Sequence, residues 1–365
     1  MPIPNPFKPT AGASPPQLVG RQSVIDDFAE SLDDGPGAPS RLMRLTGARG
    51  TGKTVMLTAT AEEAAGRGWL VVSDTVVTDV TARLTKSVRR ALSAQGQIET
   101  DGEDFRYTME VALDELEQQG LGLLITLDEV HTAGLEQMKE ITVAMQHLQR
   151  DGRNIAFVFA GLPSPIAELL NDKVLTFLRR AEPVELRDVP LPSVQSAFLE
   201  TITENGRTIT DNALAQITVA TGGYPFMIQL VGYHVWRVSR EGLITSEDAE
   251  LGIPAARKRL GAMVHSTALR DASAVDRTFL LAMSLDDGPS KISDIRERMH
   301  AGSGYASMYR QRLLNVGLIN APAHGYVEFA LPYMRDFLRE DITYSEMADR
   351  MRHGEDPGIN DDEDE

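Results

Sequence analysis

The segment Gly47–Thr54 matches the phosphate-binding pattern G-x-x-x-x-G-K-[ST] at every fixed position. Its residues are Gly47, Ala48, Arg49, Gly50, Thr51, Gly52, Lys53 and Thr54. Glycines let backbone N–H groups turn inward around phosphate oxygens, and the N-terminus of a following helix adds its dipole. We expect Lys53 to bridge the β- and γ-phosphates and the Thr54 hydroxyl to bind Mg²⁺. The segment therefore predicts a P-loop that binds ATP with Mg²⁺.

Two acids, Asp128 and Glu129, follow the apolar run Gly122–Leu127. Open parallel sheets hold ligands at the carboxyl ends of their strands. We expect Asp128 to hold the magnesium, directly or through water, and Glu129 to polarise the attacking water. A strand that ends in two acids is a weak signal alone, but downstream of a P-loop it indicates nucleotide hydrolysis. His131 follows closely, but a single histidine here is more often structural, so we assign it no role.

The elements that must position these residues follow from an alternation of apolar runs and helical stretches. The predicted strands are 42–46, 69–74, 122–127, 155–160 and 183–186. The predicted helices between them are 53–65, 80–94, 105–119 and 135–150. This alternation predicts an α/β fold in which helices cover both faces of a parallel sheet, as a three-layer core over residues 18–188.

After Val189 the strands stop and only helices are predicted. They span 193–204, 212–221, 225–239 and 246–264, with Gly206 ending the first and Asp211 capping the second. A third unit has helices 276–284, 292–299 and 305–315, then two strands around Ala323–Gly325 and a last helix, 333–339. This layout predicts a helical lid over 189–268 and a winged helix-turn-helix over 269–340. Residues 1–17 are expected to form an extended arm, and the acidic residues 341–365 a disordered tail.

Composition limits the possible functions. The formal net charge is −17, which argues against a generally basic nucleic-acid binder. The segment Gly354–Glu365 carries seven acids and no base, so the rest of the chain carries −17 + 7 = −10, and a local basic face stays possible. The absence of cysteine excludes disulfides and suits a reducing cytoplasm. The sequence contains no apolar run long enough to predict a membrane span. Its N-terminal segment lacks the apolar stretch of a secretory signal.

Several segments resemble the origin-recognition-complex-like and STAND-like branch of the AAA+ ATPases, including a bacterial group with a winged helix. Leu18-Val19-Gly20-Arg21 looks like the Val-Gly-Arg box of that branch, which implies that Leu18, Val19 and Gly20 lie against the adenine. The other shared segments are GARGTGKT, AGLPS (160–164), TGGYPFMIQLVGYHVW (221–236) and NAPAHG (320–325). The resemblance runs from about Leu18 to Glu340.

Two departures from the AAA+ pattern concern turnover. Many members place a polar sensor residue at the end of the fourth strand, where this chain has Ala160-Gly161 and Ser164 as the nearest hydroxyl. Many also place a sensing arginine in the lid helix, where this chain has Pro225. Both departures favour a slow switch over a fast motor.

Arg179 and Arg180 precede the last predicted strand. A cation there can face the γ-phosphate of a neighbouring subunit as an arginine finger, in a homo-oligomer formed with ATP. The alternative is a solvated or salt-bridged pair, and the sequence favours neither.

The predicted winged helix contains four arginines in its second and third helices. They are Arg296, Arg298, Arg310 and Arg312, interspersed with Asp294 and Glu297. If the third helix meets DNA, Arg310 and Arg312 are the leading contacts, Arg312 toward a groove and Arg310 toward phosphate. The apolar side of that helix is expected to be Met308, Leu313 and Val316. The alternative is a domain for protein contacts whose arginines lie on a solvated face.

Together these features predict a cytoplasmic, ATP-hydrolysing switch that acts on duplex DNA or a DNA-bound protein complex. One alternative is a signalling scaffold that holds ATP or ADP and recruits proteins through the winged helix. Another is a transcription regulator that needs no turnover.

Overall fold

The computed structural model describes residues 3–10, 12, 15–94, 104–131, 134–239 and 242–353. It divides into two compact units: Thr10–Arg187 forms one, and Met1–Pro9 with Asp188–Glu365 forms the other. We call the first unit the core. In the second we call α7 to α10 the lid helices and the elements from Ser266 onward the C-terminal domain.

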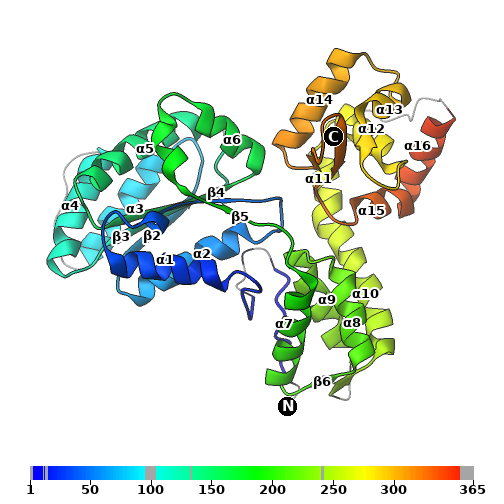
Figure 1. The fold of residues 1–365 in the computed structure, drawn as a ribbon, viewed down its shortest axis with the longest axis horizontal. Helices are drawn as coiled ribbons and strands as arrows, with labels where there is room; N and C mark the ends of the chain where they lie inside the picture. The colour runs from blue at the N-terminus through cyan, green and yellow to red at the C-terminus, as the bar shows by residue number, and fades with distance from the viewer. Residues whose placement is uncertain are drawn as a thin grey trace. The chain divides into compact units, whose positions relative to one another are not determined.

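The core is built on a parallel five-stranded sheet with the order β2-β3-β4-β1-β5 (Figure 1). The strands are β1 (Leu42–Thr46), β2 (Leu70–Thr75), β3 (Leu123–Asp128), β4 (Ile155–Gly161) and β5 (Glu182–Glu185). The helices are α1 (Gln22–Asp34), η1 (Pro39–Arg41), α2 (Lys53–Gly66), α3 (Val80–Ala94), α4 (Phe105–Gln118), α5 (Leu135–Arg150), α6 (Pro163–Asn171) and η3 (Leu175–Arg180). The predicted three-layer α/β core is therefore confirmed.

Alternate residues of the central strands enter different apolar clusters, because successive side chains of a strand point to opposite faces. In β4, Ile155, Phe157 and Phe159 pack in the cluster that contains α3, α4 and α5. Ala156, Val158 and Ala160 pack in the cluster that contains α1 and α2. Because β4 is buried along its whole length, it reads in the sequence as a continuous apolar run.

The lid helices are α7 (Leu191–Glu204), α8 (Asp211–Thr221), α9 (Pro225–Val238) and α10 (Ser246–Leu260). Two short parallel strands, β6 (Thr208–Ile209) and β7 (Leu243–Ile244), join them. Asp211 does not cap α8 as predicted. Thr210 is the N-cap residue, and its side chain accepts a hydrogen bond from the Ala213 N–H, so Asp211 lies in the first helical turn.

The segment predicted as an extended arm has no regular secondary structure where it is described, but part of it packs on the lid helices. Phe7 is only 3% exposed, and its ring lies 5.7 Å from that of Phe198 and 6.4 Å from that of Trp236. The Asn5 side chain donates to Tyr233 O at 3.0 Å. This part of the extended segment is therefore held on the lid helices, because an aromatic ring gains free energy when it leaves water.

We expect Phe7→Ala to destabilise the lid helices by about 3 kcal/mol, since it leaves a cavity between two aromatic rings. Gly232→Ala should act in the same direction, because a Cβ there would lie 2.4 Å from the Phe7 ring. Denaturant unfolding followed by Trp236 fluorescence, in a Trp69→Phe background, measures both effects. The exposed Ile3 provides the control: Ile3→Ala should change stability by less than about 0.5 kcal/mol. Equal midpoints for Phe7→Ala and Ile3→Ala would show that the packed segment does not stabilise the lid helices.

In its described residues, the C-terminal domain consists of short helices and three strands, and two helices follow the last strand. The elements are α11 (Ser266–Arg270), α12 (Ala274–Ser284), β8 (Ser290–Lys291), α13 (Ile292–Arg298), α14 (Ser303–Asn315), β9 (Ile319–Asn320), β10 (Tyr326–Phe329), α15 (Met334–Glu340) and α16 (Ile342–Arg352). The three strands form an antiparallel sheet with β10 in the middle. The sequence predicted the strands on either side of Ala323–Gly325 but missed β8, which is only two residues long.

For this part of the chain, one predicted helix changes type along its length, and one predicted disordered segment is ordered. The predicted helix 246–264 ends its α-helical part at Leu260 and continues as a π-helical turn, η4 (Gly261–His265). Disorder from residue 341 is contradicted by α16, whose Ala348 and Met351 are buried in the domain core. The acidic segment 354–365 lies outside the described residues. Within the described ranges, the helices are all too short or too polar to cross a membrane.

Candidate nucleotide-binding site

The P-loop connects β1 to α2, as predicted, and its glycines adopt conformations that other residues rarely reach. Gly50 and Gly52 have positive φ angles of 74° and 92°. At Gly47 a Cβ would lie 2.6 Å from Leu186 O and 2.5 Å from the Thr51 hydroxyl. The loop therefore needs glycine at these positions to bring its backbone N–H groups round toward the start of α2.

Lys53 is the first residue of α2, and its ammonium group points back to the loop. Its Nζ donates to Gly47 O at 2.9 Å and to Ala48 O at 2.8 Å. Burial lowers the pKa of Lys53 to about 8, although the negative charge of Asp128 opposes that shift. The side chain is therefore mainly protonated at pH 7, and the loop's own carbonyls hold its charge.

Thr54 and Asp128 come from α2 and the end of β3, and their side chains meet. The Thr54 hydroxyl donates to Asp128 Oδ2 at 2.6 Å. The other carboxylate oxygen, Oδ1, accepts from the Glu129 N–H at 2.8 Å, which fixes the orientation of the carboxylate. A hydroxyl beside a carboxylate is an all-oxygen donor pair, which fits Mg²⁺.

Glu129 has a positive φ of 52°, in the left-handed region that non-glycine residues seldom occupy. The next residue is fixed, because Val130 N donates to Ala160 O at 2.8 Å. The Glu129 side chain is exposed, so its carboxylate can face a ligand at the carboxyl edge of the sheet. Backbone strain of this kind costs about 1–3 kcal/mol and is concentrated at functional sites.

The end of β4, where many AAA+ proteins place a polar sensor, has no room for a side chain. A Cβ at Gly161 would lie 2.6 Å from Val130 O. Ser164 lies in the first turn of α6 instead of at the end of the strand. The close approach of the two backbones explains the glycine at this position.

The segment Leu18–Arg21 forms a turn in which the Arg21 N–H donates to Leu18 O at 3.0 Å. The Leu18 side chain packs on the apolar cluster of α1 and α2, and Gly20 has a φ of 67°. Arg21 Nη2 donates to Arg187 O at 2.5 Å, which attaches this segment to the end of the core. The sequence analysis assigns no role to Arg21. Its position in the motif Leu18–Arg21 is the sequence feature that could have indicated one.

Arg179 and Arg180 are exposed at the end of η3, just before β5. Because β5 runs parallel to β1, they lie at the amino edge of the sheet, whereas the P-loop follows the carboxyl end of β1. A five-residue strand spans about 16 Å. The structure therefore does not bring either arginine to the P-loop of its own chain.

Arg310 and Arg312 of α14, the residues predicted to contact DNA, are less accessible than the sequence suggested. Arg312 Nε lies 3.0 Å from Asp276 Oδ2. Asp276 is buried, and a buried carboxylate needs a counter-charge, so Arg312 is held against α12 rather than free for a groove. Arg310 is half-buried.

The apolar side of α14 was also predicted wrongly. Leu313 is buried as expected, but Met308 is 56% exposed and Val316 is exposed as well. Ala306 provides the other buried contact. The exposed side of the helix carries Tyr305, whose ring lies 4.8 Å from that of Tyr309.

Comparison with known proteins identifies two parts of the chain. Residues 17–158 match the family model described as AAA ATPase domain. Residues 262–338 match the model described as a domain of unknown function, DUF8462. A search of curated proteins found no match.

Solved structures similar to this chain include three from archaea. The Walker-type ATPase PABY2304 of Pyrococcus abyssi has a TM-score of 0.67 at 15% identity, covering 88% of this chain and 96% of that chain. The ORC2 protein of Aeropyrum pernix, in ADPNP–ADP complexes, has a TM-score of 0.65 at 16% identity, covering 95% and 97%. CDC6P of Pyrobaculum aerophilum has a TM-score of 0.51 at 14% identity, covering 90% and 94%. Residues 17–158 are therefore similar to the AAA ATPase domain, and the chain shares its fold with the Pyrococcus abyssi ATPase and the Aeropyrum pernix ORC2 protein.

Proposed function

We propose that the protein is a slow ATP-hydrolysing switch that binds ATP with Mg²⁺ at the P-loop. The observation that carries the proposal is the pair formed by Thr54 and Asp128 at 2.6 Å, together with the half-buried Lys53 of the same loop. The backbone of Gly47–Thr54 would surround the phosphates, and Leu18, Val19 and Gly20 would lie against the adenine. The Aeropyrum pernix ORC2 protein, which shares the fold, was solved with ADPNP and ADP.

In this proposal each side chain has one task. Lys53 turns from the carbonyls of Gly47 and Ala48 to the β- and γ-phosphates. Its ammonium group thereby exchanges two neutral hydrogen-bond acceptors for charged ones. Thr54 and Asp128 hold Mg²⁺, which neutralises charge on the phosphate oxygens when it is bound. Glu129 orients the attacking water and accepts its proton. Slow turnover is supported by Gly161, whose position leaves no room for a sensor side chain.

We propose that the output is delivered by the C-terminal domain, as a winged helix over residues 269–340. Three helices with a three-stranded antiparallel sheet support this assignment, and α14 would be the helix that meets duplex DNA or a DNA-bound protein complex. A second candidate, a scaffold that recruits proteins, is favoured by the exposed Tyr305 and Met308 and by the pairing of Arg312 with Asp276.

ATP turnover of the purified protein, with and without duplex DNA, tests the proposal. A switch that acts on DNA should show slow turnover that changes when DNA is added. DNA titrations at several salt concentrations should also give an affinity that falls with salt, and each phosphate contact should add about one unit to the slope of log affinity against log salt concentration. Turnover without any DNA binding would favour the protein-recruiting scaffold, and no turnover under any condition would leave only a nucleotide-holding role.

A pH dependence of ATP affinity follows from the lowered pKa of Lys53. Phosphate oxygens bind the protonated amine, and free Lys53 loses its proton above a pKa of about 8. Affinity should therefore be nearly constant from pH 7 to 8 and then fall by up to about tenfold per pH unit. In Lys53→Arg the guanidinium stays charged, so its affinity should not fall over the same range. Parallel curves for the two proteins, measured by isothermal titration calorimetry, would show that Lys53 does not face the phosphates.

We propose further that Arg179 or Arg180 acts as a finger in trans, within a homo-oligomer formed with ATP. Their position at the amino edge of the sheet leaves only a neighbouring subunit's site as a target. An alanine at the active one should lower turnover by about 10³-fold or more with nearly unchanged ATP affinity. Alanine at exposed Lys173 of the same region is the control. A wild type that hydrolyses ATP while remaining monomeric in sedimentation experiments would exclude the finger.

A further inference from the structure

Tyr333 joins the lid helices to the C-terminal domain through a side chain that spans both. It precedes α15, and its hydroxyl donates to Ala220 O, near the end of α8, at 2.6 Å. Its ring lies against the guanidinium of Arg257 from α10, with the Arg257 Cζ 4.8 Å from the ring centre. The last carbonyls of a helix have no partner within the helix. The Tyr333 hydroxyl therefore occupies an acceptor that α8 itself leaves open.

The backbone of Tyr333 is strained. Its φ is 61°, in the left-handed region, where a bulky aromatic residue is an outlier. Such a conformation persists only when surrounding contacts determine it, and here these contacts include the hydroxyl on α8 and the ring on α10.

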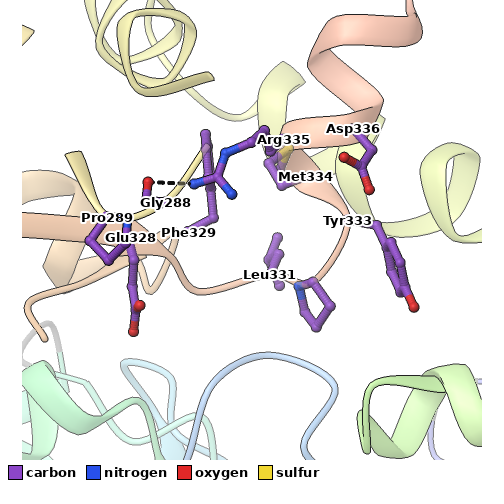
Figure 2. Close-up of a pocket in the computed structure, with 10 residues that line it drawn as sticks. Gly288, Pro289, Glu328, Phe329, Leu331, Tyr333, Met334, Arg335 and Asp336 are labelled. Atoms are coloured by element: carbon purple, nitrogen blue, oxygen red, sulfur yellow. Dashed lines mark hydrogen bonds between the residues drawn. The ribbon is translucent and has the colours of Figure 1, made fainter. Parts of the chain in front are cut away.

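The neighbouring residues hold one side of this segment and leave the other side open. The ring of buried His265 hydrogen-bonds to Pro332 O at 2.9 Å, and it lies 5.2 Å from the Phe337 ring. On the open side, Leu331, Tyr333 and Arg335 border a cavity of about 230 Å³ (Figure 2). The segment therefore has space in which to rearrange without displacing the domain core.

The acceptor of the Tyr333 hydroxyl lies close to the point where the chain enters the lid helices. Val189, one residue after the start of this unit, donates its N–H to Gly223 O at 2.7 Å. A Cβ at Gly223 would lie 2.3 Å from Val189 O, so the two backbones are in close contact. Gly223 is three residues from Ala220. A rotation of the lid helices about the Asp188–Val189 link would therefore move the carbonyl that Tyr333 holds.

We propose that Tyr333 is a positioning residue, a latch that transmits nucleotide-dependent movement of the lid helices to the C-terminal domain. This inference rests on the proposed ATP-dependent switch. The π-helical turn Gly261–His265 connects the lid helices to the C-terminal domain covalently, and the Tyr333 contact with Ala220 O is a second connection. With both connections in place, the domain moves together with the lid helices. Without the hydroxyl the π-helical turn remains as the covalent joint, and the orientation of the domain no longer depends on nucleotide.

The test measures the orientation of the domain directly. The chain has no cysteine, so Ser87→Cys in α3 of the core and Ser293→Cys in α13 of the C-terminal domain create two unique labelling positions, both exposed. Distances between spin labels are measured without nucleotide, with ADP and with a non-hydrolysable ATP analogue. We expect the wild-type distance to shift with the analogue and Tyr333→Phe to lose that shift while its ATP affinity is unchanged. Tyr333→Gly, which relaxes the backbone, should lose it too.

Tyr326→Phe is the matched control, because it removes a hydroxyl from β10 in the same domain and should keep the full shift. A Tyr333→Phe protein that shifts like the wild type would overturn the latch. So would a wild type that binds the analogue without any shift. Failure of the wild type to bind ATP at all is a different result, since it would reject the proposed function itself.

Discussion

Lys53→Ala is expected to weaken ATP binding by roughly a hundredfold or more, with the fold intact. In the proposed complex the ammonium group would make charge-assisted hydrogen bonds to phosphate, each worth about 1.5–3 kcal/mol. The other cation of the P-loop, Arg49, is exposed. The change also frees the carbonyls of Gly47 and Ala48, which water can reach once the side chain is gone. Isothermal titration calorimetry with ATP and Mg²⁺ measures the loss.

The matched control is Lys86→Ala, which removes an exposed lysine of α3 and should leave ATP affinity unchanged. Thermal unfolding of both variants checks that the core sheet is preserved. Tight ATP binding by a folded Lys53→Ala protein would contradict the P-loop assignment and the function proposed from it.

Glu129→Gln is expected to keep ATP binding and to lower turnover by between about a hundredfold and ten-thousandfold. The amide has the shape of the carboxylate but cannot accept a proton from water. The hydrogen bond from the Glu129 N–H to Asp128 Oδ1 involves only the backbone of residue 129, so the magnesium-binding carboxylate should stay in place. Phosphate release under multiple-turnover conditions measures the effect.

Glu129→Gly separates catalysis from backbone strain. Glycine accepts the φ of 52° without cost, so this variant should be at least as stable as the wild type and equally inactive. Wild-type turnover in Glu129→Gln would show that another group activates the water.

The core was predictable because each of its signals is local. The segment 122–127 is a nearly continuous apolar run, and the two acids follow it directly, so the run predicts a buried strand and the acids mark its carboxyl end. The helices 80–94 and 135–150 have the predicted bounds. Gly152 marks the end of the second of them. Thr54 lies in the helix that follows β1 and Asp128 ends β3, so the parallel sheet places both side chains at its carboxyl edge.

The errors concern side chains whose partners are distant in sequence. The pairing of Arg312 with Asp276 depends on how α14 packs against α12, which helical periodicity does not specify. Met308 and Val316 fitted an apolar stripe but face solvent, because the domain uses Ala306 and Leu313. Likewise, the hydroxyl of Tyr333 finds its acceptor 113 residues earlier in the chain. In each case the partner or the exposure of the side chain depends on a tertiary contact, which the local sequence does not specify.

The packing of Phe7 on the lid helices has a consequence for the order in which the protein acquires its structure during synthesis. The ring's partners, Phe198 and Trp236, are translated after the whole core, which is continuous from Thr10 to Arg187. At 5–20 residues per second, roughly 10–40 s separate Phe7 from Phe198 on the ribosome. Throughout that interval the sheet can close around the P-loop while an apolar aromatic residue beside it has no site to occupy. The nucleotide-binding core can thus fold before the partners of Phe7 have been made, and Phe7 is buried only after the lid helices have been translated.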